Sequence, residues 1–148
     1  MRKGLVAGLL IALASPAYAH DLDGVWVNEA GSAVTFKVAE DGILSGYYQT
    51  ELGQPDAESR FPLTGWTQGD VLAFSVKFTG FGSITSWSGQ VSEDETGPFI
   101  RTLWHYTKDI PDDEEAEDLW RSINAGAAIF RPVEPDHEPK VDLPDKMD

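Results

Sequence analysis

Tryptophan, hydroxyl and amide side chains alternate along three segments of this 148-residue chain in a way that could bind a polar small molecule. The members of each set fall on every second position: Trp26 and Asn28; Ser83, Thr85 and Trp87; Thr102, Trp104 and Tyr106. On a β-strand, residues with this spacing share one face. A buried hydroxyl or amide costs about 1 to 3 kcal/mol unless a partner satisfies it, so a polar ligand is one explanation of the pattern. A water-filled barrel mouth is the other.

The elements that would position these faces are short β-strands. Gly, Asn, Asp and Pro separate the apolar segments, and no long stretch shows helical periodicity. We expect strands near residues 23–29, 33–40, 43–51, 61–68, 70–79, 83–93, 98–107 and 122–131. Short connections such as Glu40-Asp41-Gly42 favour hairpins between sequential neighbours. The sequence therefore predicts an all-β fold, an eight-stranded antiparallel up-and-down β-barrel.

The two ends of the chain differ in composition from the middle. Residues 1–19 carry two basic residues, a short apolar run and small residues at the end, which predicts a cleaved signal peptide and export to the extracellular space or the periplasm. The apolar run is too short for a membrane-spanning helix. Residues 132–148 are acidic and proline-rich and are expected to form a flexible tail. Residues 20–131 are left as one domain.

Charge and composition exclude several classes of function. A net charge of −14 opposes binding to nucleic acid or to an anionic membrane. The chain has no Cys, so it has neither disulfides nor thiolate metal ligands. The acidic segment 109–118 lacks the spacing of a calcium loop and is expected to be a solvated loop, with no metal bound. No nucleophile-base signature is present, so we expect no enzyme, although a hydrolase with paired carboxylates has no signature to find.

Six short motifs occur in the order in which the avidin and streptavidin family carries them. They are Gly24-Val25-Trp26-Val27-Asn28-Glu29-Ala30-Gly31-Ser32; Gly46-Tyr47-Tyr48; Ala57-Glu58-Ser59-Arg60-Phe61 with Leu63-Thr64-Gly65; Thr85-Ser86-Trp87-Ser88-Gly89-Gln90; Thr102-Leu103-Trp104; and Trp120 with Gly126 and Phe130. Over residues 21–131 the chain resembles that family. The resemblance implies high-affinity, non-catalytic binding of biotin in the mouth of the barrel, with no cofactor.

The resemblance also implies roles for single residues. The donors to the ureido oxygen of biotin would be Asn28, Ser32 and Tyr48. The remaining polar contacts would be Thr50 and Thr85 for the ureido nitrogen and ring sulfur, and Ser83 and Gln54 for the carboxylate. The aromatic box would be Phe78, Trp87 and Trp104, and Trp26 would pack at the barrel floor. Trp120 resembles a tryptophan donated across a subunit interface, which implies a homotetramer, with a dimer as the alternative.

Three positions depart from the family pattern. Ala128 stands where streptavidin has an aspartate that accepts from a ureido nitrogen, and such a bond is worth about 1.5 to 3 kcal/mol. Asn124, on the same face, is a candidate substitute. Phe78 replaces a tryptophan, and Phe81 is bulky beside the carboxylate position. These changes keep open a barrel that has shifted to another small apolar ligand, and a purely structural barrel is a further alternative.

Overall fold

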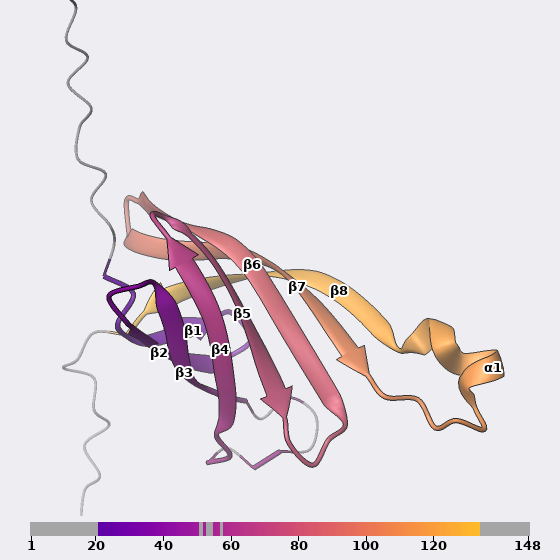
Figure 1. Ribbon diagram of the computed structural model, residues 1–148. Helices are drawn as coiled ribbons and strands as arrows, with labels where there is room; N and C mark the ends of the chain where they lie inside the picture. The colour runs from indigo at the N-terminus through magenta and orange to yellow at the C-terminus, as the bar shows by residue number, and fades with distance from the viewer. Residues whose placement is uncertain (1–20, 51, 53–54, 57, 134–148) are drawn as a thin grey trace, which may run out of the picture.

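The computed structural model describes residues 21–50, 52, 55–56 and 58–133 (Figure 1). The predicted signal peptide lies outside the described residues, as does the tail beyond residue 133. In the described part, no helix is long and apolar enough to cross a membrane.

Eight strands form the barrel, and each pairs antiparallel with its sequence neighbours. They are β1 (Gly24–Asn28), β2 (Ala33–Val38), β3 (Ile43–Gln49), β4 (Phe61–Gln68), β5 (Val71–Phe78), β6 (Ser83–Asp94), β7 (Gly97–Lys108) and β8 (Ile123–Pro132). The β8 strand returns to pair with β1, with Asn28 opposite Phe130, and this pairing closes the barrel. The predicted fold class and strand order are confirmed.

The interior of the barrel is filled by the alternate residues that the hydrophobic pattern selects. Leu72, Phe74 and Val76 of β5 are buried, while the intervening residues face outward. Phe74 stacks on Trp87 with ring centroids 5.0 Å apart and an interplanar angle of 8°. Burial of each such side chain stabilises the fold by about 1.5 to 3 kcal/mol. Trp26 is 2% exposed, and its indole nitrogen donates to the Leu22 carbonyl at 3.0 Å, so it packs within this core.

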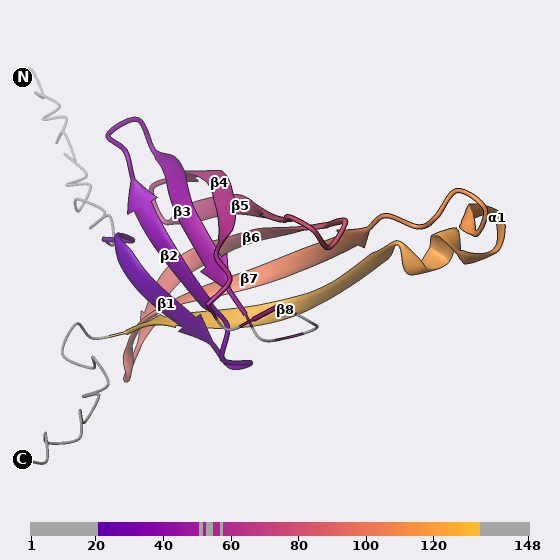
Figure 2. The same cartoon turned by 90° about the horizontal axis from the view of Figure 1, so that it is seen from below.

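The connection between β7 and β8 is not the simple loop that its acidic composition predicts. It contains a short helix, α1 (Glu115–Asp118), followed by a 3₁₀ turn (Leu119–Arg121), and it extends away from the barrel (Figures 1 and 2). The Pro111 carbonyl accepts from the amides of Glu114 and Glu115, and Arg121 pairs with Asp118. These local bonds offset the repulsion among the acidic side chains. Sequence composition alone does not indicate such bonds.

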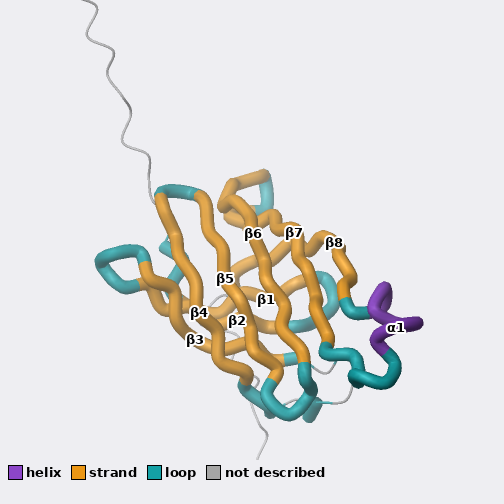
Figure 3. The backbone as a smooth tube through the Cα atoms, turned by 45° about the vertical axis from the view of Figure 1, so that its right-hand side comes forward, coloured by secondary structure: helices purple, strands orange, loops and turns teal. Residues whose placement is uncertain are grey.

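Antiparallel order sorts the connections between the two ends of the barrel. The connections after β1, β3, β5 and β7 lie at one end, and those after β2, β4 and β6 lie at the other (Figure 3). At this second end β1 begins and β8 finishes, with Trp26 opposite Pro132. There Arg131 makes a two-pronged ion pair with Asp94 of the β6–β7 hairpin, at 3.2 and 2.6 Å. Both ends of the described chain therefore leave the barrel on the same side.

Candidate ligand-binding site

The end of the barrel that carries the β1–β2, β3–β4 and β5–β6 connections contains a cavity of about 440 Å³. Such a volume suits a small organic ligand. Its walls come from six strands and three connections: Asn28, Glu29, Ala30, Tyr48, Thr50, Leu52, Pro55, Phe78, Phe81, Ser83, Thr85, Trp87, Trp104, Tyr106, Ala127 and Ala128. The structure thus brings nine of the residues selected from the sequence together around one space: Asn28, Tyr48, Thr50, Phe78, Ser83, Thr85, Trp87, Trp104 and Ala128.

The turn after β1 fixes the orientation of the Asn28 side chain. Its Oδ1 accepts from the backbone amides of Ala30 at 3.0 Å and Ser32 at 2.9 Å. Asn and Asp favour turns because their side chains bond the backbone two residues on, and Gly31 supplies the positive φ of 80° that this turn requires. Since backbone amides are donors, the atom that meets them must be the oxygen. The amide nitrogen of Asn28 is therefore left to donate elsewhere.

Two polar side chains meet at the Tyr48 hydroxyl. Tyr48 hydrogen-bonds with Ser32 and with Asn28. Ser32 in turn donates to Thr50 Oγ1 at 2.8 Å, and Thr50 Oγ1 also accepts from the Leu52 amide at 3.0 Å. Ser32 is 1% exposed and lies behind the cavity wall, held by these contacts. The arrangement presents hydroxyl and amide donors at the buried end of the cavity.

Burial raises the pKa of the Tyr48 hydroxyl above its usual value of 10.0, and the hydrogen bonds to Ser32 and Asn28 oppose this rise in pKa only in part. Tyr48 is therefore protonated at neutral pH. A protonated phenol can donate to an acceptor atom of a ligand, and hydroxyl hydrogens rotate to suit their partner. The cluster can accordingly bind a ligand oxygen.

Aromatic rings enclose the remainder of the cavity. The ring centroid of Trp87 lies 5.0 Å from that of Tyr48. The ring centroid of Phe78 lies 6.0 Å from that of Tyr48 and 4.9 Å from that of Phe61. Rigid rings of this kind contribute large contact area at little entropic cost. The indole Nε1 of Trp87 is buried and has no hydrogen-bond partner among the residues described. A buried donor without a partner costs about 1 to 3 kcal/mol, which a ligand or an ordered water would offset.

Several predicted residues lie elsewhere. Trp120 is 75% exposed on the β7–β8 connection and does not line the cavity of its own barrel. Asn124 is exposed and lies opposite Tyr106, outside the cavity, so the expectation that it substitutes at Ala128 is wrong. The pairing of β8 with β1 ends at Phe130, so no β1 residue lies beside Asn124, and its side chain meets solvent. Gln54 lies outside the described residues.

Other lining residues were not selected from the sequence. Tyr106 lies opposite Thr85; the sequence pattern places it on one face with Trp104 but gives it no part in ligand binding. Glu29 is the one charged residue among the described residues that line the cavity, and its Oε2 accepts from the Ile129 amide at 2.9 Å. No short-range pattern indicates this contact, since the two residues are 100 positions apart.

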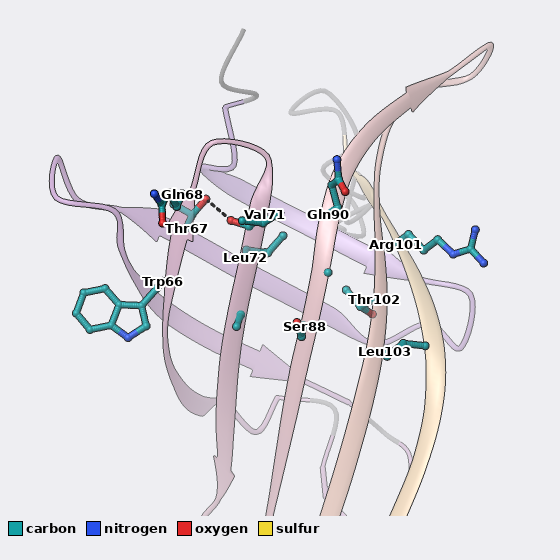
Figure 4. Close-up of a pocket in the computed structure, with 12 residues that line it drawn as sticks. Trp66, Thr67, Gln68, Val71, Leu72, Ser88, Gln90, Arg101, Thr102 and Leu103 are labelled. Atoms are coloured by element: carbon teal, nitrogen blue, oxygen red, sulfur yellow. Dashed lines mark hydrogen bonds between the residues drawn. The ribbon is translucent and has the colours of Figure 1, made fainter. Parts of the chain in front are cut away.

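A second hollow, of about 590 Å³, lies on the outer faces of β4 to β7 (Figure 4). The small residues Ala73, Ser88 and Gly89 are among those that line it, and Trp66 and Leu103 stand on either side. These two large side chains are 63% and 64% exposed. Large exposed apolar side chains beside a shallow hollow are typical of a protein contact rather than of a small-molecule site.

A closed eight-stranded barrel with donors and aromatic rings at one mouth defines a small-ligand-binding barrel. The family model described as the Avidin family matches residues 16–133, and the chain belongs to that family. Members of this family are non-catalytic binding proteins.

Solved structures of biotin-binding proteins are similar to this chain. The X-ray structure of a biotin-binding protein from chicken is 27% identical, covers 78% of this chain and 98% of its own, and has a TM-score of 0.67. Xenavidin is 27% identical, with 78% and 99% coverage and a TM-score of 0.68. A rhizavidin–biotin complex is 25% identical, with 75% and 92% coverage and a TM-score of 0.63.

Proposed function

We propose that this protein binds biotin with high affinity in the cavity at the mouth of its barrel, and that it catalyses nothing. The observation that carries the proposal is the pair of Asn28 and Tyr48 in the wall of an aromatic-lined cavity, with Ser32 behind them. The Asn28 amide nitrogen is directed away from the turn by its own oxygen, and Tyr48 is protonated. Convergent donors of this kind bind a carbonyl oxygen and polarise it.

The other groups of the cavity fit the rest of the ligand. Thr50 and Thr85 provide hydroxyls for the ureido nitrogen and the ring sulfur, and Ser83, which is buried beside them, provides one for the carboxylate. Gln54 would be a second partner of the carboxylate. The rings of Phe78, Trp87 and Trp104 would pack against the apolar part of biotin.

A second candidate ligand is favoured by the departures from the family pattern. Phe78 and Phe81 make the cavity more apolar than a tryptophan and an alanine would, and the methyl side chain of buried Ala128 cannot accept a hydrogen bond. A different small apolar molecule would then bind in place of biotin, and the affinity for biotin would be weak.

We further propose a secreted homotetramer, with a dimer as the alternative, released after cleavage of residues 1–19. The exposed ring of Trp120 and the outer hollow between Trp66 and Leu103 support an assembly, because a second subunit would cover both. Trp120 sits on the β7–β8 connection, at the same end of the barrel as the cavity. It would close the cavity of a neighbouring subunit.

Calorimetric titration of the mature protein with biotin tests the central proposal. We expect one site per chain and a marked rise in melting temperature, since a ligand that binds only the folded state stabilises it. The absence of both heat and a thermal shift at millimolar biotin would reject biotin as the ligand. Testing of small apolar ligands in the same assay would then address the second candidate.

The close packing of Trp104 on Gly126 provides a further test. A Cβ added at Gly126 would lie 2.7 Å from Cε2 of Trp104, so Gly126→Ala must displace the indole. We expect biotin to dissociate about tenfold faster, because a shift of one cavity wall removes contacts worth about 1.4 kcal/mol. Stopped-flow release of a fluorescent biotin measures the change. Ala125→Ser, on the outer face of the same strand, is the control, and equal off-rates for the two variants would contradict the packing role.

A further inference from the structure

We infer that the Glu29 carboxylate is a ligand-binding group that supplies the acceptor which Ala128 lacks. This inference rests on the proposed binding of biotin and adds a specificity-determining residue to that site. Biotin would donate a ureido N–H to Glu29 Oε1.

The first observation is where the Glu29 carboxylate lies. Glu29 lines the cavity, and its Oε2 accepts from the backbone amide of Ile129 at 2.9 Å. The regular pairing of β1 with β8 ends at Asn28 and Phe130, so the Glu29 side chain extends the pairing by one step. Only the Cα and carbonyl carbon of Ala128 separate its Cβ from the Ile129 nitrogen. The carboxylate is therefore held beside Ala128.

The second observation is that half of this carboxylate is unused. An ionised carboxylate has two oxygens and about four positions that can accept a hydrogen bond. Oε2 takes the Ile129 amide, and no residue that the structure describes donates to Oε1. The bond to Ile129 holds the side chain in place before ligand arrives, which lowers the entropy that binding must remove.

The third observation is the chemistry of the surrounding walls. Asn28 and Tyr48 present donors at this end of the cavity, and Trp87 adds a buried indole N–H without a partner in the described chain. A ureido group needs acceptors for its two N–H groups as well as donors for its oxygen. Among the described lining residues, Glu29 alone offers a charged acceptor, and hydrogen bonds to charged groups are the stronger ones.

Two substitutions separate ligand binding from a structural role. Glu29→Gln keeps an oxygen for the Ile129 amide but places an NH₂ group where the ligand N–H would arrive. Glu29→Ala removes both contacts. We expect both variants to release fluorescent biotin about tenfold faster than the wild type, and we expect Glu29→Gln to leave the melting temperature of the ligand-free protein unchanged. Glu40→Gln, an exposed acid in the β2–β3 turn at the far end of the barrel, should release biotin at the wild-type rate.

A double-variant cycle with Ala128→Asp gives the decisive result. If Glu29 already supplies the acceptor, Ala128→Asp should slow release at least fivefold more in the Glu29→Ala background than in the wild type, where two carboxylates would repel each other. Wild-type protein that binds biotin, with unchanged off-rates in both Glu29 variants or an equal effect of Ala128→Asp in both backgrounds, would overturn the inference alone. Wild-type protein that binds no biotin would instead overturn the proposed function.

Discussion

Biotin should bind about a hundredfold more weakly when Ser32→Ala and Tyr48→Phe are combined in one chain. The double variant removes the Tyr48 hydroxyl from the cavity wall and the Ser32 hydroxyl from behind that wall, and the two residues are 5% and 1% exposed. Each lost hydrogen bond to a polarised ureido oxygen is worth about 1.5 kcal/mol, and the two together about 3 kcal/mol. Competition binding against a fluorescent biotin measures the ratio of dissociation constants.

The matched control uses the opposite face of β3, the strand that carries Tyr48. Ser45→Ala with Tyr47→Phe removes the same two hydroxyl types from positions of β3 that do not line the cavity. This control pair should bind biotin as the wild type does. If both double variants lose affinity equally, the loss comes from a weakened barrel and the donor cluster is not the binding site.

The same site gives a pH dependence with a defined sign. Tyr48 donates only while it is protonated, and burial, the main cause, raises its pKa above 10.0. The contribution of Tyr48 to binding should therefore be constant from neutral pH up to the usual tyrosine value, and it should be lost as the pH rises through the raised pKa. In Tyr48→Phe this alkaline loss should be reduced.

Trp120→Ala should raise the biotin off-rate by about thirty- to a thousandfold and should weaken assembly of the subunits. A tryptophan buried at the centre of an interface is worth about 2 to 4 kcal/mol. In a single chain Trp120 is 75% exposed and lies on a connection that projects from the barrel, so it has no site of its own to fill (Figure 2). Light scattering and biotin release, measured on the same samples, report assembly and ligand retention together.

Leu119→Ala is the control for that prediction, because Leu119 is 59% exposed on the same 3₁₀ turn but carries no ring. We expect a much smaller effect on release from this variant. A monomeric wild-type protein that is saturated with biotin, or a Trp120→Ala protein with an unaltered off-rate, would contradict the shared cavity.

Most of the fold could be predicted from the sequence because its signals are local. Alternation of apolar and polar residues, as in Leu72 to Phe78, defines which face of a strand is buried, and short turns define which strands pair. The exception is the β7–β8 connection. Its acidic composition indicates exposure. The helical turn, however, depends on contacts of the Pro111 carbonyl and of Arg121, and composition does not reveal these contacts.

The cavity could be predicted in the same measure. Residues on inner faces, such as Thr85, Trp87 and Trp104, meet in the cavity because β-strand periodicity places them there. Contacts that close the barrel cannot be predicted in this way, because they join residues that are far apart in the sequence. The bond between Glu29 and Ile129 depends on β8 returning to β1, and the exposure of Asn124 depends on how far β8 extends beyond the end of β1. The spacing of nearby residues predicts neither the bond nor the exposure.

The common side on which both described chain ends leave the barrel bears on how the protein could be tethered. Trp26 and Pro132 lie opposite each other at the end away from the cavity, and the Arg131–Asp94 ion pair holds β8 to the hairpin there. A fusion partner, a solid support or a lipid anchor joined near residue 21 or residue 133 would therefore hold each barrel with its mouth pointing away from the attachment. An array of such barrels on a surface would keep every cavity open to the solution.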